Sequence, residues 1–224
     1  MKLKWGTCPL HPAVLVAVAI ALAWMTHSNV HAEERVVKIV ALGDSLMSRV
    51  RLPADAYSFP EKLEFALKAK GQQVAVANAG VGGDSAANGL ARLERSVPAG
   101  TDAVILELGW WDMTRGLDPN VTRAALSAIL SDLKARKVVV LLCGVRPHTN
   151  FGEEHEKAFA AMFAGLAREY NVLFYPAFDD AFVDDAQLKV ADGLHPNAAG
   201  IEAVVTRILP YVEALIDRAR RNGG

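Results

Sequence analysis

The chain has 224 residues, of which 52% are hydrophobic and 22% are charged, and its formal net charge is −1. This length fits one large domain or two small ones, and a single open α/β sheet can accommodate all of it. The near-neutral charge lacks the basic excess of nucleic-acid-binding proteins, and the apolar content excludes a disordered chain. The sequence contains no repeat of fixed period, which excludes solenoids and propellers.

The chain begins with the pattern of a secretory signal peptide. Two lysines precede an apolar run over residues 13–25, and a small-residue cleavage site ends at Ala32. The run is shorter than the roughly 20 residues that span a bilayer, although an uncleaved anchor is the alternative. We therefore expect a signal peptide over 1–32, a single domain over 33–224, and a periplasmic or secreted protein with no stable membrane insertion after cleavage.

The first predicted strand, Val36–Leu42, leads into the tetrapeptide Gly43-Asp44-Ser45-Leu46. A serine at a strand-to-helix turn exposes its hydroxyl, and the helix N-terminus supplies N–H donors and positive potential. Ser45 is therefore a candidate nucleophile. The alternative is that Ser45 only caps the N-terminus of the next helix, which is a common role of serine.

A helix from about Pro60 to Lys70, ended by Gly71, leads to the second predicted strand, Gln73–Asn78. The glycine-rich segment Asn78–Ser85 follows. Its glycines lack the G-x-G-x-x-G spacing of a dinucleotide site, and no P-loop lysine follows. We therefore expect no bound nucleotide there, whereas the exposed N–H groups of the loop could stabilise an oxyanion.

Three further apolar runs predict strands, and helical stretches separate them. The predicted strands are Ala103–Leu108, Val138–Leu142 and Val172–Tyr175. Apolar residues recur at i, i+3, i+4 and i+7 in the helical stretches, at positions 126, 129, 130 and 133, at 159, 162, 163 and 166, and at 201, 204, 205 and 208. The only cysteine beyond residue 32, Cys143, follows the fourth strand and is predicted to be a small buried side chain.

Asp192 precedes His195 by three residues, in a segment that leads into the last helix. A carboxylate at this spacing can hold the imidazole by Nδ1 and leave Nε2 to take a proton from a serine. This role would select His195 from the three histidines that lie beyond residue 32.

The alternation of five strands with helices predicts a flavodoxin-like, three-layer α/β/α fold with a five-stranded parallel sheet and right-handed crossovers. Because nearly every strand residue is apolar, we expect strands buried on both faces. Functional loops of such a sheet lie beyond the carboxyl ends of the strands. The Ser45 turn, the glycine-rich loop and the Asp192 segment would meet there.

Taken together, these segments resemble the sequence blocks of GDSL-type, or SGNH, hydrolases, particularly the small secreted arylesterases, thioesterases and lysophospholipases. The resemblance extends from Val36 to about Leu215. The blocks are Ile39–Leu46, Asn78–Ser85, Leu106–Asp112 and Asp192–Asn197.

The resemblance implies a role for each matching residue. Ser45 would be the nucleophile, His195 the general base and Asp192 the residue that orients it. The N–H groups of Ser45 and Gly83 would form the oxyanion hole. The implied reaction is hydrolysis of a small-molecule carboxylic ester (aryl or short-acyl) or thioester through an acyl-enzyme, with no metal or organic cofactor.

One position departs from the family pattern. The third block normally reads Gly-x-Asn-Asp, in which the asparagine donates to the oxyanion, but here Trp111 occupies that position. The indole N–H could partly replace the amide, or the ring could fill an acyl or aryl pocket. Alternatively the site could be weakened, because the loss of one oxyanion donor typically costs about 10²–10³ in kcat.

Two other functions stay open at this point. Within the same chemistry, the protein could be a carbohydrate O-acetylesterase. From a different class, it could be a catalytically weakened ligand-binding member of the fold, which the substitution at Trp111 would favour.

Overall fold

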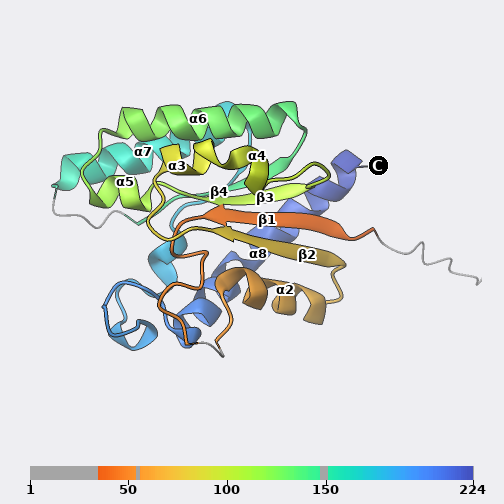
Figure 1. Ribbon diagram of the computed structural model, residues 1–224, viewed down its shortest axis with the longest axis horizontal. Helices are drawn as coiled ribbons and strands as arrows, with labels where there is room; N and C mark the ends of the chain where they lie inside the picture. Colours follow the sequence, from red (N-terminus) through yellow and green to blue (C-terminus); the bar gives the residue numbers. More distant parts are fainter. Residues whose placement is uncertain (1–34, 54–55, 147–150, 224) are drawn as a thin grey trace, which may run out of the picture. The chain divides into compact units, whose positions relative to one another are not determined.

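Five parallel strands form one sheet, and their order across the sheet is β2-β1-β3-β4-β5 (Figure 1). The strands are β1 (Val37–Gly43), β2 (Val74–Gly80), β3 (Ala103–Glu107), β4 (Val139–Cys143) and β5 (Leu173–Tyr175). This is the flavodoxin strand order, so the predicted fold class is confirmed. The computed structural model describes residues 35–53, 56–146 and 151–223, and the predicted signal peptide lies outside them.

Helices cover both faces of the sheet. One face carries α2 (Phe59–Ala69) and α8 (Ala198–Gly223), and the other carries α3 (Ala86–Ala91), α4 (Leu93–Ser96), α5 (Trp110–Thr114), α6 (Pro119–Ala135) and α7 (Glu153–Tyr170). Two short 3₁₀ helices, η1 (Phe178–Ala181) and η2 (Ala186–Leu188), connect β5 to α8. Residues Val36–Gly224 form one compact unit.

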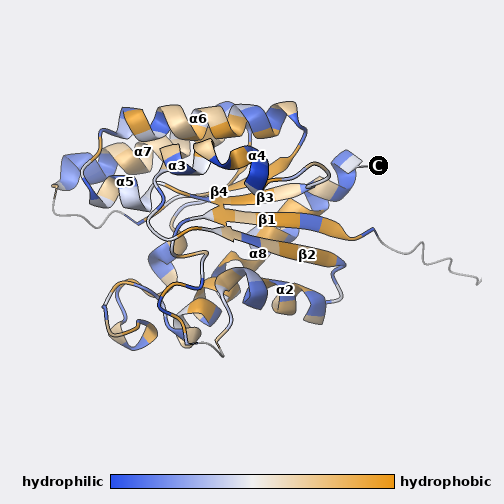
Figure 2. Cartoon of the chain, viewed as in Figure 1, coloured by the Kyte–Doolittle hydropathy of each residue, from blue (hydrophilic) through white to orange (hydrophobic). Residues whose placement is uncertain are grey.

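The central strands build two hydrophobic cores because successive side chains point to opposite faces of a sheet. On β3, Ala103 and Ile105 join the core under α2 and α8, whereas Val104 and Leu106 join the core under α6 and α7. Figure 2 shows these strands as hydrophobic segments between the two helix layers. The predicted helical apolar positions are buried as expected, and so is Cys143.

The expectation that every strand is buried on both faces is wrong for β2. Only Val74 of this strand is buried, and the others are exposed or half-buried. The reason is its place at the edge of the sheet, where it pairs only with β1. Its alanines and asparagine tolerate this exposure. The expectation also fails at β5, the other outermost strand, where only Tyr175 is buried.

The carboxyl ends of the strands lie in register, and this register positions the functional loops. Gly43 at the end of β1 pairs with Gly80 on one side and Glu107 on the other, and Glu107 pairs with Cys143. The loops after β1, β2 and β3 therefore start side by side, at the carboxyl ends of the strands.

Two kinds of feature are absent from the described residues. No helix among them has the length and apolar character needed to cross a bilayer. No group of three or more His, Cys, Asp or Glu side chains among them could hold a metal ion.

Candidate active site

Ser45 lies two residues beyond β1, half-buried, in a turn where the Ser48 N–H donates to the Asp44 carbonyl at 3.3 Å. The prediction that a helix follows directly is wrong, because α2 begins at Phe59 with Ser58 as its N-cap. The alternative role of Ser45 as a helix cap is wrong for the same reason. The Asp44 side chain accepts the Leu46 N–H at 3.0 Å, a local bond that competes with helix formation.

Hydrogen bonds occupy the N–H groups on both sides of Ser45. The Asp44 N–H donates to Glu107 Oε2 at 3.4 Å, and the Leu46 N–H is taken by the Asp44 carboxyl. The Ser45 N–H between them donates to no acceptor among the described residues. A free N–H beside a nucleophile is what an oxyanion hole requires.

The glycine-rich loop lies against the nucleophile. A Cβ built on Gly82 would come within 3.9 Å of Ser45 Cβ and 2.9 Å of Val50 Cγ2. Gly83 has a φ of +83°, and a Cβ built there would meet nothing within 4 Å. Glycine is therefore required at 83 by backbone conformation rather than by space. Within the described chain the Gly83 N–H also has no acceptor.

Arg92, which the sequence analysis did not identify, fastens these two segments together. Its side chain is 5% exposed and forms an ion pair with Asp84 at 2.6 Å. It also donates to the carbonyls of Gly43 and Ala79 at 2.9 and 2.8 Å. Arg92 therefore joins the ends of β1 and β2 to the glycine-rich loop. No motif marks this residue, because its partners lie up to 49 positions away.

The structure brings Asp192 and His195 into direct contact. His195 Nδ1 lies 2.8 Å from Asp192 Oδ2, and Asp192 Oδ1 accepts the N–H groups of Leu194 and His195 at 2.9 and 3.0 Å. Partial burial alone would raise the pKa of Asp192, but these three hydrogen bonds and the imidazole lower it to about 2. The carboxylate therefore stays ionised and holds the imidazole with Nε2 directed elsewhere.

Hydrogen bonds hold the segment that carries His195 on both sides of this residue. The Val190 N–H donates to the His195 carbonyl at 2.9 Å, and Lys189 and Pro196 form an antiparallel bridge. Asn197 then accepts the Gly200 N–H at 3.0 Å in the first turn of α8. These bonds fix the histidine at the start of the last helix.

Two contacts link the His195 segment to the turn of Ser45. Arg51 Nε lies 3.7 Å from Asp192 Oδ2, and Leu46 and Leu194 line the same hollow. Among the described residues, however, no hydrogen bond joins Ser45 to His195. The hollow is thus lined by sequence neighbours of the predicted serine and of the predicted Asp–His pair, not by these three residues themselves.

This hollow has a volume of about 250 Å³ and is mostly apolar. Its lining residues are Leu46, Trp110, Thr114, Asp179, Phe182, Val183, Lys189, Gly193 and Leu194. Asp179 is 3% exposed, and this burial raises its pKa to about 6. The hollow offers an apolar surface beside both halves of the predicted triad.

Trp111, at the position of the family asparagine, contacts residues of its own helix. Its ring lies under the Arg115 guanidinium at 4.2 Å and 6.4 Å from the Trp110 ring. Its indole N–H makes no hydrogen bond within the described chain. Trp110, rather than Trp111, lines the hollow.

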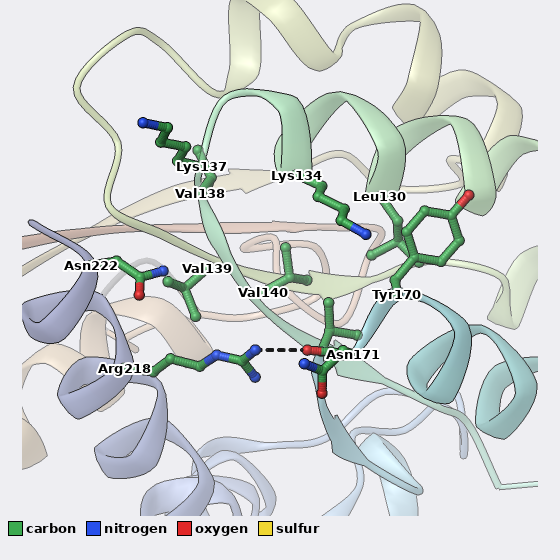
Figure 3. A pocket seen from close by; sticks show the side chains of 11 residues that line it. Leu130, Lys134, Lys137, Val138, Val139, Val140, Tyr170, Asn171, Arg218 and Asn222 are labelled. Atoms are coloured by element: carbon green, nitrogen blue, oxygen red, sulfur yellow. Dashed lines mark hydrogen bonds between the residues drawn. The ribbon is translucent and has the colours of Figure 1, made fainter.

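Another hollow, of about 390 Å³, lies at the opposite edge of the sheet, where β4 begins (Figure 3). It contains none of the predicted site residues. Lys134 and Arg218 line it near the C-terminal ends of α6 and α8, where the helix dipole favours positive charge. Arg218 Nη2 donates to the Asn171 carbonyl at 2.8 Å. These cations stabilise helix ends. We therefore place the candidate active site at the carboxyl ends of the strands rather than in this hollow.

Comparison with known proteins gives one consistent result. A model of the GDSL-like lipase/acylhydrolase family matches residues 41–203, which include all five predicted site residues. An arylesterase of Vibrio mimicus is 34% identical over 161 residues, covering 71% of this chain and 80% of its own.

A thioesterase 1/protease 1/lysophospholipase L1 of Escherichia coli (strain K12) is 35% identical over 160 residues, covering 71% of this chain and 75% of its own. The crystal structure of AlinE4, an SGNH-hydrolase family esterase, is 36% identical with a TM-score of 0.67, and the match covers 80% of this chain and 96% of that one.

Proposed function

Because the chain belongs to the GDSL-like lipase/acylhydrolase (SGNH) family and is a serine ester hydrolase, we propose that it cleaves aryl or short-acyl carboxylic esters or thioesters through an acyl-enzyme on Ser45. The observation that carries this proposal is the Asp192–His195 pair at 2.8 Å. Leu194, between these two residues, lines the same hollow as Leu46 of the Ser45 turn, and the Ser45 N–H has no acceptor among the described residues.

The proposed reaction begins when His195 Nε2 takes the proton of the Ser45 hydroxyl and Ser45 Oγ attacks the acyl carbon. The N–H groups of Ser45 and Gly83 receive the oxyanion. His195 then gives its proton to the leaving alcohol or thiol, and the bond to the leaving group breaks. Water, deprotonated by His195, then attacks the acyl-enzyme. The bond between the acyl carbon and Ser45 Oγ breaks, the acid leaves, and His195 returns the proton to Ser45 Oγ.

Asp192 keeps the imidazole in the required tautomer and stabilises its protonated form. Catalytic hydrogen bonds are often long in unliganded enzymes, and we expect the contact between His195 and Ser45 to form when an ester binds. Every step uses groups of this chain, so the proposal includes no metal and no organic cofactor.

The volume of the hollow supports the choice of substrate. About 250 Å³ is below the range of roughly 300–1,000 Å³ that is common for sites of drug-sized ligands. An aryl group or a short acyl chain could contact Leu46, Trp110 and Leu194 there. The two curated relatives are an arylesterase and a thioesterase/lysophospholipase. They favour neither of the alternatives, a carbohydrate O-acetylesterase or a catalytically weakened ligand-binding protein.

The proposal also includes export. The charged start, apolar run and small-residue site of residues 1–32 support a cleaved signal peptide and a periplasmic or secreted domain over 33–224.

Fluorophosphonate labelling combined with ester hydrolysis tests the nucleophile. We expect the wild-type protein to label at Ser45, and Ser45→Ala to abolish both labelling and hydrolysis of short-acyl aryl esters. His195→Ala should also remove the label. The control is Ser131→Ala, on the exposed side of α6, which should label normally. An active, labelled Ser45→Ala protein would contradict the proposal.

A further inference from the structure

Glu107 is a carboxyl group placed inside a hydrophobic core. It continues the alternation of Ala103 and Ile105 on β3, so its side chain lies on the face covered by α2 and α8, and it is 0% exposed. A Cβ built on Gly43 would lie 2.7 Å from Glu107 Oε2 and 2.5 Å from Met47 Cγ. The glycine at 43 thus leaves room for this carboxyl directly beneath the turn of Ser45.

Asp44 is the partner of Glu107 and is also 0% exposed. The Asp44 N–H donates to Glu107 Oε2 at 3.4 Å, which places the two carboxyl groups side by side. Among the described residues, Asp44 Oδ2 and Glu107 Oε1 have no hydrogen-bond partner. Carboxylate oxygens only accept hydrogen bonds, so two ionised groups would leave this contact without a donor.

The surroundings of the pair add negative rather than positive charge. The titratable and charged groups around it are Asp84 and Arg92 beside the glycine-rich loop, Asp112 on α5, Asp179 on η1 and Cys143 on β4. Arg92 reaches the same turn, but it donates to the Gly43 carbonyl and to Asp84. It therefore does not neutralise the pair.

Two buried carboxylates in contact cannot both ionise at neutral pH. Burial is the main cause that raises the pKa of both groups, that of Asp44 to about 7 and that of Glu107 well above its ordinary value. The pair therefore retains one proton.

We propose, on the basis of the function above, that Glu107 stays protonated at neutral pH, donates to Asp44, and acts as a positioning residue for the Ser45 turn. The shared proton satisfies the buried oxygens while Glu107 Oε2 accepts the Asp44 N–H. Asp44 in turn accepts the Leu46 N–H. This chain of bonds occupies the N–H groups on both sides of Ser45 and leaves the Ser45 N–H free.

The proton has a second consequence for catalysis. A doubly ionised pair beneath the oxyanion hole would oppose the negative charge that forms in the transition state, and in a water-excluded site this repulsion is strong. Retention of one proton halves the charge of the pair. We therefore expect kcat, rather than KM, to depend on the protonation of Glu107.

Two substitutions at Glu107 test the proposal. Glu107→Gln presents a carbonyl to the Asp44 N–H and an amide donor to its carboxyl at every pH, so we expect at least a third of wild-type kcat and a smaller fall in kcat at alkaline pH. Glu107→Leu removes both bonds. We expect it to lower kcat by roughly 10–10²-fold, with KM changed by less than about threefold.

Infrared spectroscopy gives a readout that does not depend on how Glu107→Leu folds. At pH 8 the wild-type protein should show the carbonyl band of a protonated, buried carboxyl, and Glu107→Gln should lack it. Absence of this band in the wild type, or a loss of kcat in Glu107→Gln as large as in Glu107→Leu, would overturn the proposal. Fluorophosphonate labelling of Ser45 in the wild type reports separately on the proposed function.

Discussion

Trp111 is the residue at which the site departs most from the pattern of its family. Its ring lies under Arg115, and its indole N–H is not committed to any described acceptor. In the proposed mechanism the N–H groups of Ser45 and Gly83 receive the oxyanion, so this mechanism uses two donors rather than three.

Trp111→Asn should add the third donor. We expect kcat on a short-acyl aryl ester to rise, by up to about 10²-fold, because one oxyanion donor typically contributes 10²–10³. Arg115→Ala is the matched control, since it removes the contact with the Trp111 ring without adding a donor, and it should give no such rise. An unchanged or lower kcat in Trp111→Asn would contradict the account of a missing donor.

Asp179 makes stability depend on pH in a direction opposite to that of most carboxylates. Its pKa in the folded protein is raised to about 6 from an ordinary value of 3.8, mainly by burial. Between these two pH values the folded state holds a proton that the unfolded state releases. Its contribution therefore lowers the free energy of unfolding as pH rises through this interval.

Asp179→Asn should remove this contribution, because an amide does not titrate. Relative to the wild type, the variant should gain about 2–3 kcal/mol in free energy of unfolding between pH 4 and pH 7. Urea unfolding at several pH values measures the gain. Asp217→Asn, an exposed change on α8, should keep the wild-type pH dependence. Parallel curves for wild type and Asp179→Asn would show that Asp179 ionises normally.

The individual site residues differed in how visible they were in the sequence. Asp192 and His195 are three positions apart, and this spacing alone predicts their contact. Glu107 gives a weaker signal, as a lone acid at the end of an apolar strand. Arg92 gives none, because its importance depends on carbonyls that the fold brings to it from β1 and β2.

At the scale of elements, the joint between β1, β2 and the glycine-rich loop depends on Arg92. The arginine and Asp84 are both buried, at 5% and 11% side-chain exposure. If one member of such a pair is removed, a buried charge is left uncompensated, which typically costs about 3–5 kcal/mol. The same change releases the two strand ends that carry Ser45 and Gly83.

Arg92→Met should therefore lower both stability and kcat. We expect a loss of about 3–5 kcal/mol in free energy of unfolding, measured by chemical denaturation, together with a lower kcat under folding conditions. Adding Asp84→Asn should recover part of the stability, since the orphaned charge is removed. Arg123→Met breaks an exposed pair with Glu169 and should cost no more than about 1 kcal/mol. If the two arginine substitutions lowered the free energy of unfolding equally, Arg92 would not have the proposed role in joining β1, β2 and the glycine-rich loop.

Local sequence patterns predicted where strands and helices occur along the chain, but they predicted less well which elements lie next to each other in the fold. The apolar runs located all five strands to within two residues, because β-branched runs have few alternatives. They did not show that β2 lies at an edge, since strand order depends on pairing between distant segments. A turn replaces the helix expected directly after Ser45. In this turn the Asp44 side chain accepts the Leu46 N–H, and Glu107 accepts the Asp44 N–H.

For the whole molecule, the parallel sheet accounts for the location of catalysis. Each strand of the sheet ends at the same edge, so loops separated by more than 100 residues in sequence meet there: Arg51 reaches Asp192 at 3.7 Å. Every group in the proposed reaction belongs to the compact unit Val36–Gly224. The proposed mechanism uses no residue before Val36.

A chain that begins at Glu33 should therefore be fully active. Its kcat/KM on a short-acyl aryl ester should equal, within about twofold, that of the protein recovered after export of the full sequence. If residues 1–32 are a cleaved signal peptide, mass spectrometry of the exported protein should give an N-terminus at Glu33. Deleting the apolar run over residues 13–25 should prevent export. Recovery of the uncleaved chain in the membrane fraction would instead identify this run as an anchor, and equal activity of the two forms would still assign catalysis to the domain alone.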